Sequence, residues 1–236
     1  MLADNSPNIG TGKVTHGIEL ESSINSVVEF IEIHFAQFSM KVKGELSASE
    51  KSLTDRLCKY LNRSAGSYPF HFHHENVENL DSGLSPQIDI GTISQYEHLL
   101  IGDRIYGEFD SFFSIEAKRL PTPGQKREKE YVTGYDKPSG GIERFKKGIH
   151  GKYLKYSAII GYIQGENPNH WYLRINEWID ELIASSSEIW KSEDKLIKLD
   201  IKTTGIDKFI SKNLRSEHNG EQDFISLFHF WINLVD

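Results

Sequence analysis

The stretch of sequence that decides the fold is SFFSIEAKRL, which occupies residues 111–120. Side chains of a β-strand point alternately to its two faces, so a strand here places Glu116 and Lys118 on the same face. Phe113 and Ile115 then point to the opposite face. The segment therefore predicts a strand with one apolar face and one face that presents a carboxylate beside an ammonium group.

A second charged residue in a similar setting lies upstream, in the segment PQIDI at residues 86–90. Asp89 stands between two isoleucines, so a strand here buries both isoleucines on one face and presents Asp89 on the other. If the two strands pair, Asp89, Glu116 and Lys118 converge. Carboxylate oxygens are hard ligands that suit Mg²⁺, and a neighbouring lysine can orient a nucleophile or offset charge in a transition state. The three residues therefore indicate chemistry at a phosphodiester.

Hydrophobic periodicity predicts the elements around these strands. Apolar residues recur at helical spacing over residues 24–38, and the capping-box pattern Ser47-Ala48-Ser49-Glu50 predicts that a second helix follows and continues to Leu61. The other elements predicted are strands at 70–74, 87–93 and 111–120, a helix at 142–153, a buried central strand at 156–163, a helix at 175–182, and strands at 196–203 and 224–234. This order predicts an α/β fold with a three-stranded meander.

Composition favours one domain. A chain of 236 residues, of which 38% are hydrophobic, can bury one substantial core. We expect residues 1–16, which are mostly small and polar, to form a mobile tail and residues 17–236 to form the domain. Cys58 is the only cysteine, which excludes an intramolecular disulfide and a cysteine-rich zinc site and fits a reducing cytoplasm. The sequence shows no signal pattern or membrane-length apolar run, so we expect no membrane partner.

Positive charge is concentrated in one part of the chain. The formal net charge is −7, but residues 118–155 contain 11 Lys or Arg and 4 Asp or Glu, a local balance of +7 that leaves −14 for the rest. Such asymmetry indicates a basic face for nucleic-acid phosphates, although an ordinary solvated surface has the same composition. The candidate phosphate-binding residues are Arg144 and Lys147, one turn apart on the predicted helix, with Lys146 and Lys152 nearby and Lys126 and Arg127 in the preceding loop.

The pair Ile88-Asp89 followed by Ile115-Glu116-Ala117-Lys118 resembles the PD-(D/E)xK nuclease superfamily, which has the restriction-endonuclease-like fold. The core of that family is a helix, a three-stranded meander, a helix and a strand, so the resemblance implies a catalytic core at about residues 47–165. It also implies that Asp89, Glu116 and the carbonyl of Ala117 bind Mg²⁺, or Mn²⁺ as a substitute, and that Lys118 is catalytic. The sequence departs from the family pattern in that the proline, Pro86, stands three residues before the aspartate.

Glu50 has two interpretations. Members of the family often carry a further catalytic glutamate on the first core helix, and Glu50 precedes Leu53 and Leu57 on the inward-facing stripe by three and seven residues. The alternative is that Glu50 closes the capping box with Ser47. The spacing fits both interpretations.

The resemblance implies a metal-dependent endonuclease, with DNA as the favoured substrate and a restriction or phage-defence role as the biological setting. A homodimer or a defence complex is the partner expected besides nucleic acid. The alternative function is a catalytically silent module of the same fold that binds nucleic acid or protein within a larger complex. The intact set of Asp89, Glu116 and Lys118 favours the enzyme.

Overall fold

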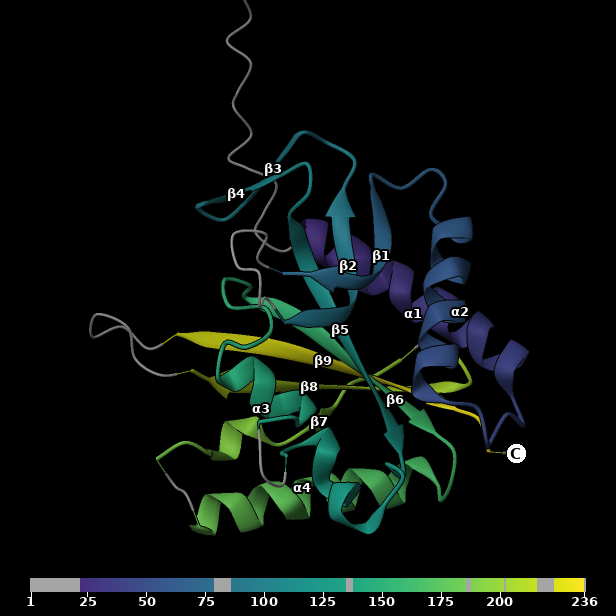
Figure 1. The fold of residues 1–236 in the computed structure, drawn as a ribbon, viewed down its shortest axis with the longest axis vertical. Coiled ribbons are helices and arrows are strands. Elements are labelled where there is room, and N and C mark those ends of the chain that lie inside the picture. Colours follow the sequence, from purple (N-terminus) through teal and green to yellow (C-terminus); the bar gives the residue numbers. More distant parts are fainter. Residues whose placement is uncertain are drawn as a thin grey trace, which may run out of the picture.

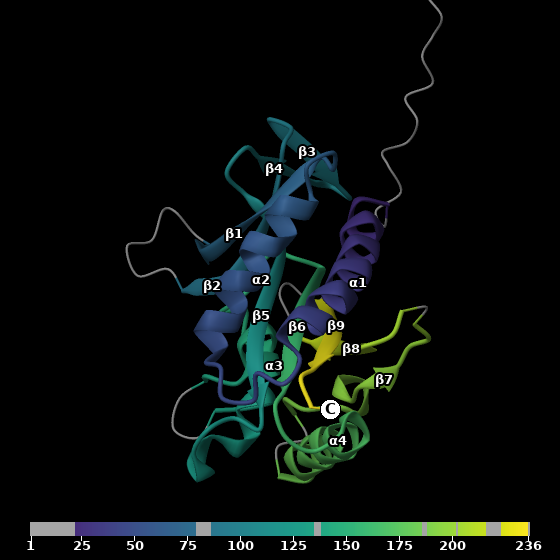
Figure 2. The ribbon, with the colours of Figure 1, turned by 90° about the vertical axis from the view of Figure 1, so that its right-hand side faces the viewer.

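The computed structural model describes residues 22–78, 86–134, 138–185, 188–201, 203–215 and 223–235, without the side chains of Gln125 and Lys126. It confirms an α/β fold, in which a mixed seven-stranded sheet has helices on both faces (Figures 1 and 2). The expected tail at residues 1–16 lies outside the described residues. None of the described helices has the length and apolar character needed to cross a membrane.

The elements follow one another with these bounds. The helices are α1 (Ser22–Val42), α2 (Glu50–Ser64), α3 (Gly141–Lys146) and α4 (Pro168–Ser185), with short 3₁₀ helices η1 (Gln125–Tyr131) and η2 (Ser192–Asp194). The strands are β1 (Phe70–Val77), β2 (Gln87–Ser94), β3 (His98–Ile101), β4 (Arg104–Gly107), β5 (Ser111–Leu120), β6 (Tyr156–Ile163), β7 (Ile197–Lys198), β8 (Ile206–Leu214) and β9 (Phe224–Asn233).

The strand order in the sheet is β1-β2-β5-β6-β9-β8-β7. Strands β1, β2 and β5 pair antiparallel in sequence order, as the meander prediction requires, and β3 and β4 form a separate hairpin inserted between β2 and β5. Strand β6 then runs parallel to β5 on one side and to β9 on the other. The hairpin lies at one end of the molecule and α4 at the other (Figure 1).

Two hydrophobic cores lie on the two faces of the sheet. Helices α1 and α2 cover one face, where Phe35 packs edge-on against Phe230 of β9 at 5.5 Å between ring centroids. Helices α3 and α4 cover the other face, where Trp178 of α4 is fully buried. Strand β6 is buried along almost its whole length, which confirms the predicted central strand.

Two predicted helix boundaries are wrong. The helix expected at 142–153 ends at Lys146, because Gly148 adopts a φ of +63°, a left-handed conformation that ends a helix and favours glycine. The N-cap of α2 is Ser49, whose Oγ accepts a hydrogen bond from the Ser52 N–H at 3.2 Å. Ser47 is therefore not the cap, and the predicted capping box is absent from α2.

The C-terminal part of the sheet also differs from the prediction. The strand expected at 196–203 is reduced to β7, and the nine-residue strand β8, together with the β3–β4 hairpin, was not predicted. Lysines at positions 208 and 212 give β8 a polar sequence with no clear strand pattern. The strand forms because all nine of its residues pair with β9, which supplies the backbone hydrogen bonds.

His229 of β9 makes stability depend on pH. It is fully buried, with Nδ1 2.9 Å from the hydroxyl of Tyr131 and Nε2 2.9 Å from the hydroxyl of Ser211. Burial lowers the pKa of His229 from 6.5 to about 3. The unfolded chain therefore binds more protons than the native state between these values, so stability is lost as pH falls below about 6.5.

We expect His229→Gln to remove this contribution. As pH falls from 6.5 to 4, the free energy of unfolding should decrease more steeply for the wild type than for the variant. The two slopes should differ by up to roughly 1.4 kcal/mol per pH unit. Urea unfolding at a series of pH values measures the difference. His170→Gln, on the exposed surface of α4, is the matched control and should keep the wild-type slope. Parallel pH profiles for wild type and His229→Gln would contradict the assignment.

Candidate functional site

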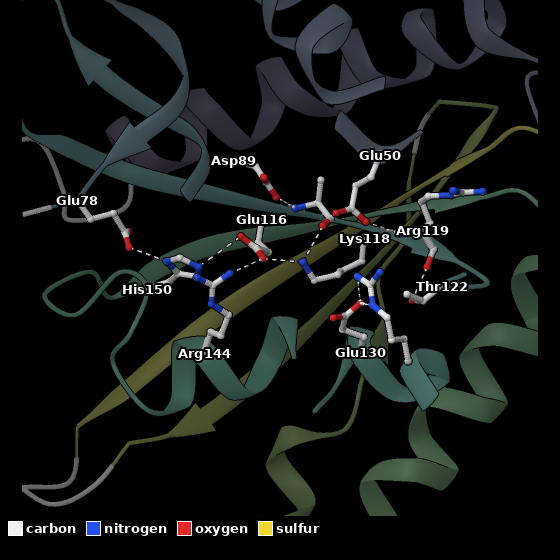
Figure 3. Close-up of polar contacts among 12 residues, drawn as sticks. Glu50, Glu78, Asp89, Glu116, Lys118, Arg119, Thr122, Glu130, Arg144 and His150 are labelled. Carbon is white, nitrogen blue, oxygen red and sulfur yellow. Dashed lines mark hydrogen bonds and ion pairs between the residues drawn. The ribbon is translucent and has the colours of Figure 1, made fainter. Parts of the chain in front are cut away.

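Strand β5 presents a buried ion pair. Glu116 and Lys118 have exposed fractions of 2% and 7%, and Lys118 Nζ lies 2.6 Å from Glu116 Oε1 (Figure 3). The same ammonium donates to the backbone carbonyl of Ala117 at 3.1 Å. The pair lies on one face of the strand as predicted, and its burial excludes an ordinary surface salt bridge.

Asp89 reaches the same point from the neighbouring strand. The pairing of β2 with β5 starts at Ile90 opposite Ile115, and beyond it the Asp89 Oδ2 accepts a hydrogen bond from the Ala117 N–H at 2.7 Å. The Asp89 carboxylate therefore accepts the hydrogen bond that a backbone carbonyl of a paired strand would accept from the Ala117 N–H. Its flanking isoleucines do not share one core as predicted: Ile90 packs on the α1 and α2 side, and Ile88 on the α3 and α4 side. Strand β2 does not pair with β5 beyond Ile90, although it still pairs with β1 at Ile88.

Glu50 joins this group from helix α2. It is the first residue of the helix, and its Oε2 accepts a hydrogen bond from the Arg119 N–H of β5 at 3.0 Å (Figure 3). The structure excludes the capping-box interpretation of Glu50, and its catalytic role stays a prediction. Its carboxylate is directed to strand β5 beside Lys118, and it does not close a capping box with Ser47.

Burial dominates the electrostatics of the site. Burial, together with the nearby charge of Glu116, raises the pKa of Asp89 to about 8. Burial also raises the pKa of Glu50, against the opposing influence of Lys118. Burial alone would lower the pKa of Lys118, but the carboxylates of Glu116, Glu50 and Asp89 together raise it. The site therefore brings together acidic side chains whose charged forms burial disfavours.

Glu116 differs from the other two acids because several cationic or polar groups surround it. Burial by itself would raise its pKa, but Lys118, His150 and Arg144 together lower it. Arg144 Nη1 lies 3.2 Å from Glu116 Oε1, and His150 Nε2 lies 3.5 Å from Glu116 Oε2. Glu116 is therefore the charged centre of the site.

The sequence analysis missed two residues of this site, His150 and Glu78. His150 lies in the turn after α3, and its Nδ1 is 2.8 Å from the Oε2 of Glu78, which directly follows β1 (Figure 3). The two residues are 72 positions apart. No local pattern joins them, and a single histidine beside a glycine is too common to be a signal.

The candidate phosphate-binding residues do not form one surface. Arg144 lies at the carboxylate cluster, Arg127 pairs with Glu130 at 2.6 Å, and the side chain of Lys126 lies outside the described part of the chain. Lys147 and Lys152 line a separate groove next to the end of α3.

Lys146 was expected to contribute to the same basic face, and this expectation is wrong. Its Nζ donates to both carboxylate oxygens of Asp194, at 2.6 and 2.8 Å, and its side chain is 2% exposed. Lys146 lies four residues after Ile142, so it shares the buried face of α3.

No protein-family model, curated protein or solved structure matches this chain. The functional argument therefore depends on the geometry of the site.

The donor atoms fit a bound cation. Lys118 Nζ already bonds to two oxygens of the expected ligand set, Glu116 Oε1 and the Ala117 carbonyl, and it interacts electrostatically with Asp89 and Glu50. Hard oxygen donors that converge on an ammonium group are also suited to Mg²⁺. Across the described residues, no three His, Cys, Asp or Glu side chains are already arranged as a complete metal site. Lys118 and Arg144 hold Glu116 Oε1 in this arrangement, so both must shift when a metal binds there.

Proposed function

We propose that this protein is a divalent-metal-dependent nuclease with a restriction-endonuclease-like core. The observation that carries the proposal is the convergence of Asp89, Glu116 and Lys118 on the backbone of Ala117, in a buried site at the β2–β5 junction. Two buried charged side chains and the half-buried carboxyl group of Asp89 around one peptide unit contribute little to stability that apolar residues could not supply. Their chemistry matches what phosphodiester hydrolysis needs.

The cost of ionising the acidic side chains of this site supports a metal. Asp89 and Glu50 both have raised pKa values because burial disfavours their charged forms. A divalent cation next to these carboxylates would offset that cost, and it would supply water activation and charge stabilisation at the phosphate. Asp89, Glu116 and the Ala117 carbonyl are the residues proposed to hold it.

The remaining residues have distinct proposed roles. Lys118 would donate to a phosphate oxygen or orient the attacking water, because its ammonium lies beside both proposed metal ligands. Glu50 interacts electrostatically with Lys118 and accepts a hydrogen bond from the peptide of Arg119, so it would keep Lys118 charged and fix the end of β5. Arg144 would contact a phosphate at the entrance, since its side chain is partly exposed and already lies at Glu116.

The proposal is tested by incubating the purified protein with plasmid DNA, linear duplex, single-stranded DNA and RNA, with Mg²⁺ or Mn²⁺ and with EDTA. We expect cleavage of at least one substrate with the metals and none with EDTA. Asp89→Asn keeps the shape and removes a ligand charge, so it should weaken metal binding in calorimetry without unfolding the protein. Undiminished cleavage in EDTA would remove the metal from the mechanism. Binding without cleavage under any metal would instead favour the silent binding module.

A second prediction concerns the basic residues on and after α3. Replacing Arg144 and Lys147 with alanine should weaken nucleic-acid binding about equally for all sequences. It should also lower the slope of log binding constant against log salt concentration by up to about 2 units. Fluorescence anisotropy at several salt concentrations measures the slope. Lys59→Ala, on an exposed part of α2, is the control and should keep the wild-type slope. An unchanged slope in the double variant would show that neither side chain contacts a phosphate.

A further inference from the structure

His150 is a buried imidazole with one nitrogen that has no hydrogen-bond partner. The side chain is completely buried, and Nε2 makes no hydrogen bond to any described residue. This nitrogen faces Glu116 Oε2 at 3.5 Å, on the side of the carboxylate opposite to Lys118 (Figure 3). An unpaired polar atom in a buried position is costly, so this one needs a physical explanation.

Glu78 determines which nitrogen of His150 carries the proton. Its Oε1 accepts hydrogen bonds from the Ser114 hydroxyl at 3.0 Å and the Gly151 N–H at 2.8 Å. Its Oε2 lies 2.8 Å from His150 Nδ1. A carboxylate held by donors in this way is an acceptor, so Nδ1 carries the proton and donates to Glu78. When Nε2 carries no proton, its lone pair faces the carboxylate of Glu116 at 3.5 Å, a repulsive contact that a cation between the two atoms would turn into an attractive one.

The turn that carries His150 is held in place by other contacts. The His150 N–H donates to the Arg144 carbonyl at 3.2 Å, and Arg215 Nη2 donates to the Gly151 carbonyl at 2.7 Å. Gly151 has a φ of +55°, and a Cβ there would lie 3.2 Å from the Ser157 hydroxyl, so the tight turn requires glycine. The imidazole is therefore fixed at Glu116 before any ligand binds.

We propose that His150 Nε2 and Glu116 Oε2 bind the same divalent metal ion, and that Glu78 holds the imidazole in the metal-binding tautomer. The inference rests on the proposed metal-dependent function and adds a nitrogen ligand on the Oε2 side of Glu116. A carboxylate that accepts from the other ring nitrogen is the usual partner of a metal-bound histidine. An imidazole ligand favours first-row transition ions, so the site selects Mn²⁺ over Ca²⁺.

The test is pulsed electron paramagnetic resonance of the full-length protein with one equivalent of Mn²⁺. This method detects a directly coordinated ¹⁴N nucleus, so it reports the ligand without any measurement of activity. We expect ¹⁴N coupling in the wild type and its loss in His150→Gln. In calorimetry His150→Gln should bind Mn²⁺ at least about 10-fold more weakly with little change for Ca²⁺, and Glu78→Gln should weaken Mn²⁺ binding about 10- to 100-fold. His170→Gln, on the exposed surface of α4, should match the wild type.

Three results would overturn the inference, and one of them would also overturn the proposed function. Bound Mn²⁺ without ¹⁴N coupling in the wild type would leave a metal site made of oxygen donors only, and coupling retained in His150→Gln would assign the nitrogen ligand to another residue. In either case the metal-dependent nuclease stands and His150 is only a packing residue. Absence of any Mn²⁺ binding would overturn both. The wild-type spectrum needs no substitution, so the test remains decisive if His150→Gln fails to fold.

Discussion

Lys118→Met is expected to lower cleavage by roughly 10²- to 10⁴-fold, the usual range for one positioned electrostatic or proton-transfer group. It should also destabilise the metal-free protein, because the buried carboxylate of Glu116 loses its closest cation, 2.6 Å away. Methionine fills a similar volume, so the loss of charge is the main change. A bound metal would replace the lost positive charge, so Mg²⁺ or Mn²⁺ should raise the melting temperature of the variant more than that of the wild type.

Cleavage assays and thermal unfolding with and without metal measure both effects. Lys51→Met is the matched control, since Lys51 forms an ion pair with Glu75 of similar length, 2.7 Å, on the exposed surface. A surface pair of that kind contributes only about 0–1 kcal/mol, so the control should keep both activity and stability. Near-wild-type cleavage by Lys118→Met would remove Lys118 from the mechanism. Destabilisation that no metal relieves would indicate a purely structural ion pair.

Lys146→Met is expected to lower the free energy of unfolding by about 3–5 kcal/mol, because it leaves the buried carboxylate of Asp194 without its cation. The neighbouring Lys147→Met is the control, since Lys147 pairs with Glu143 at a partly exposed position and should cost no more than about 1 kcal/mol. Urea unfolding of the two variants measures the difference.

A third variant separates charge from packing at this position. The double variant Lys146→Met, Asp194→Asn removes both charges and keeps an acceptor for the Lys191 N–H, which Asp194 binds at 2.8 Å. It should recover most of the lost stability. Equal stabilities of Lys146→Met and Lys147→Met would mean that the buried pair contributes no more than an exposed one.

Local sequence patterns were sufficient to predict features that lie within a single strand. The alternation in residues 111–120 placed Glu116 and Lys118 together on one face, and the apolar run at 156–163 identified the central strand. Local patterns were insufficient to predict elements that depend on a partner strand or on a neighbouring turn. Strand β8 has a polar sequence and forms through its partner β9, and α3 ends early because of the turn at Gly148.

The sequence by itself determined the α/β class, the two acidic strands and the pairing of Glu116 with Lys118, because these follow from periods of two and of 3.6 residues within one segment. Only the tertiary structure decided that Glu50 binds the end of β5, 69 positions away, and that His150 faces Glu116 with Glu78 behind it. It also decided that Lys146 is buried while Lys147 is exposed. Contacts of this kind depend on how helices and turns pack against the sheet, and neighbouring residues in the sequence carry no information about that packing.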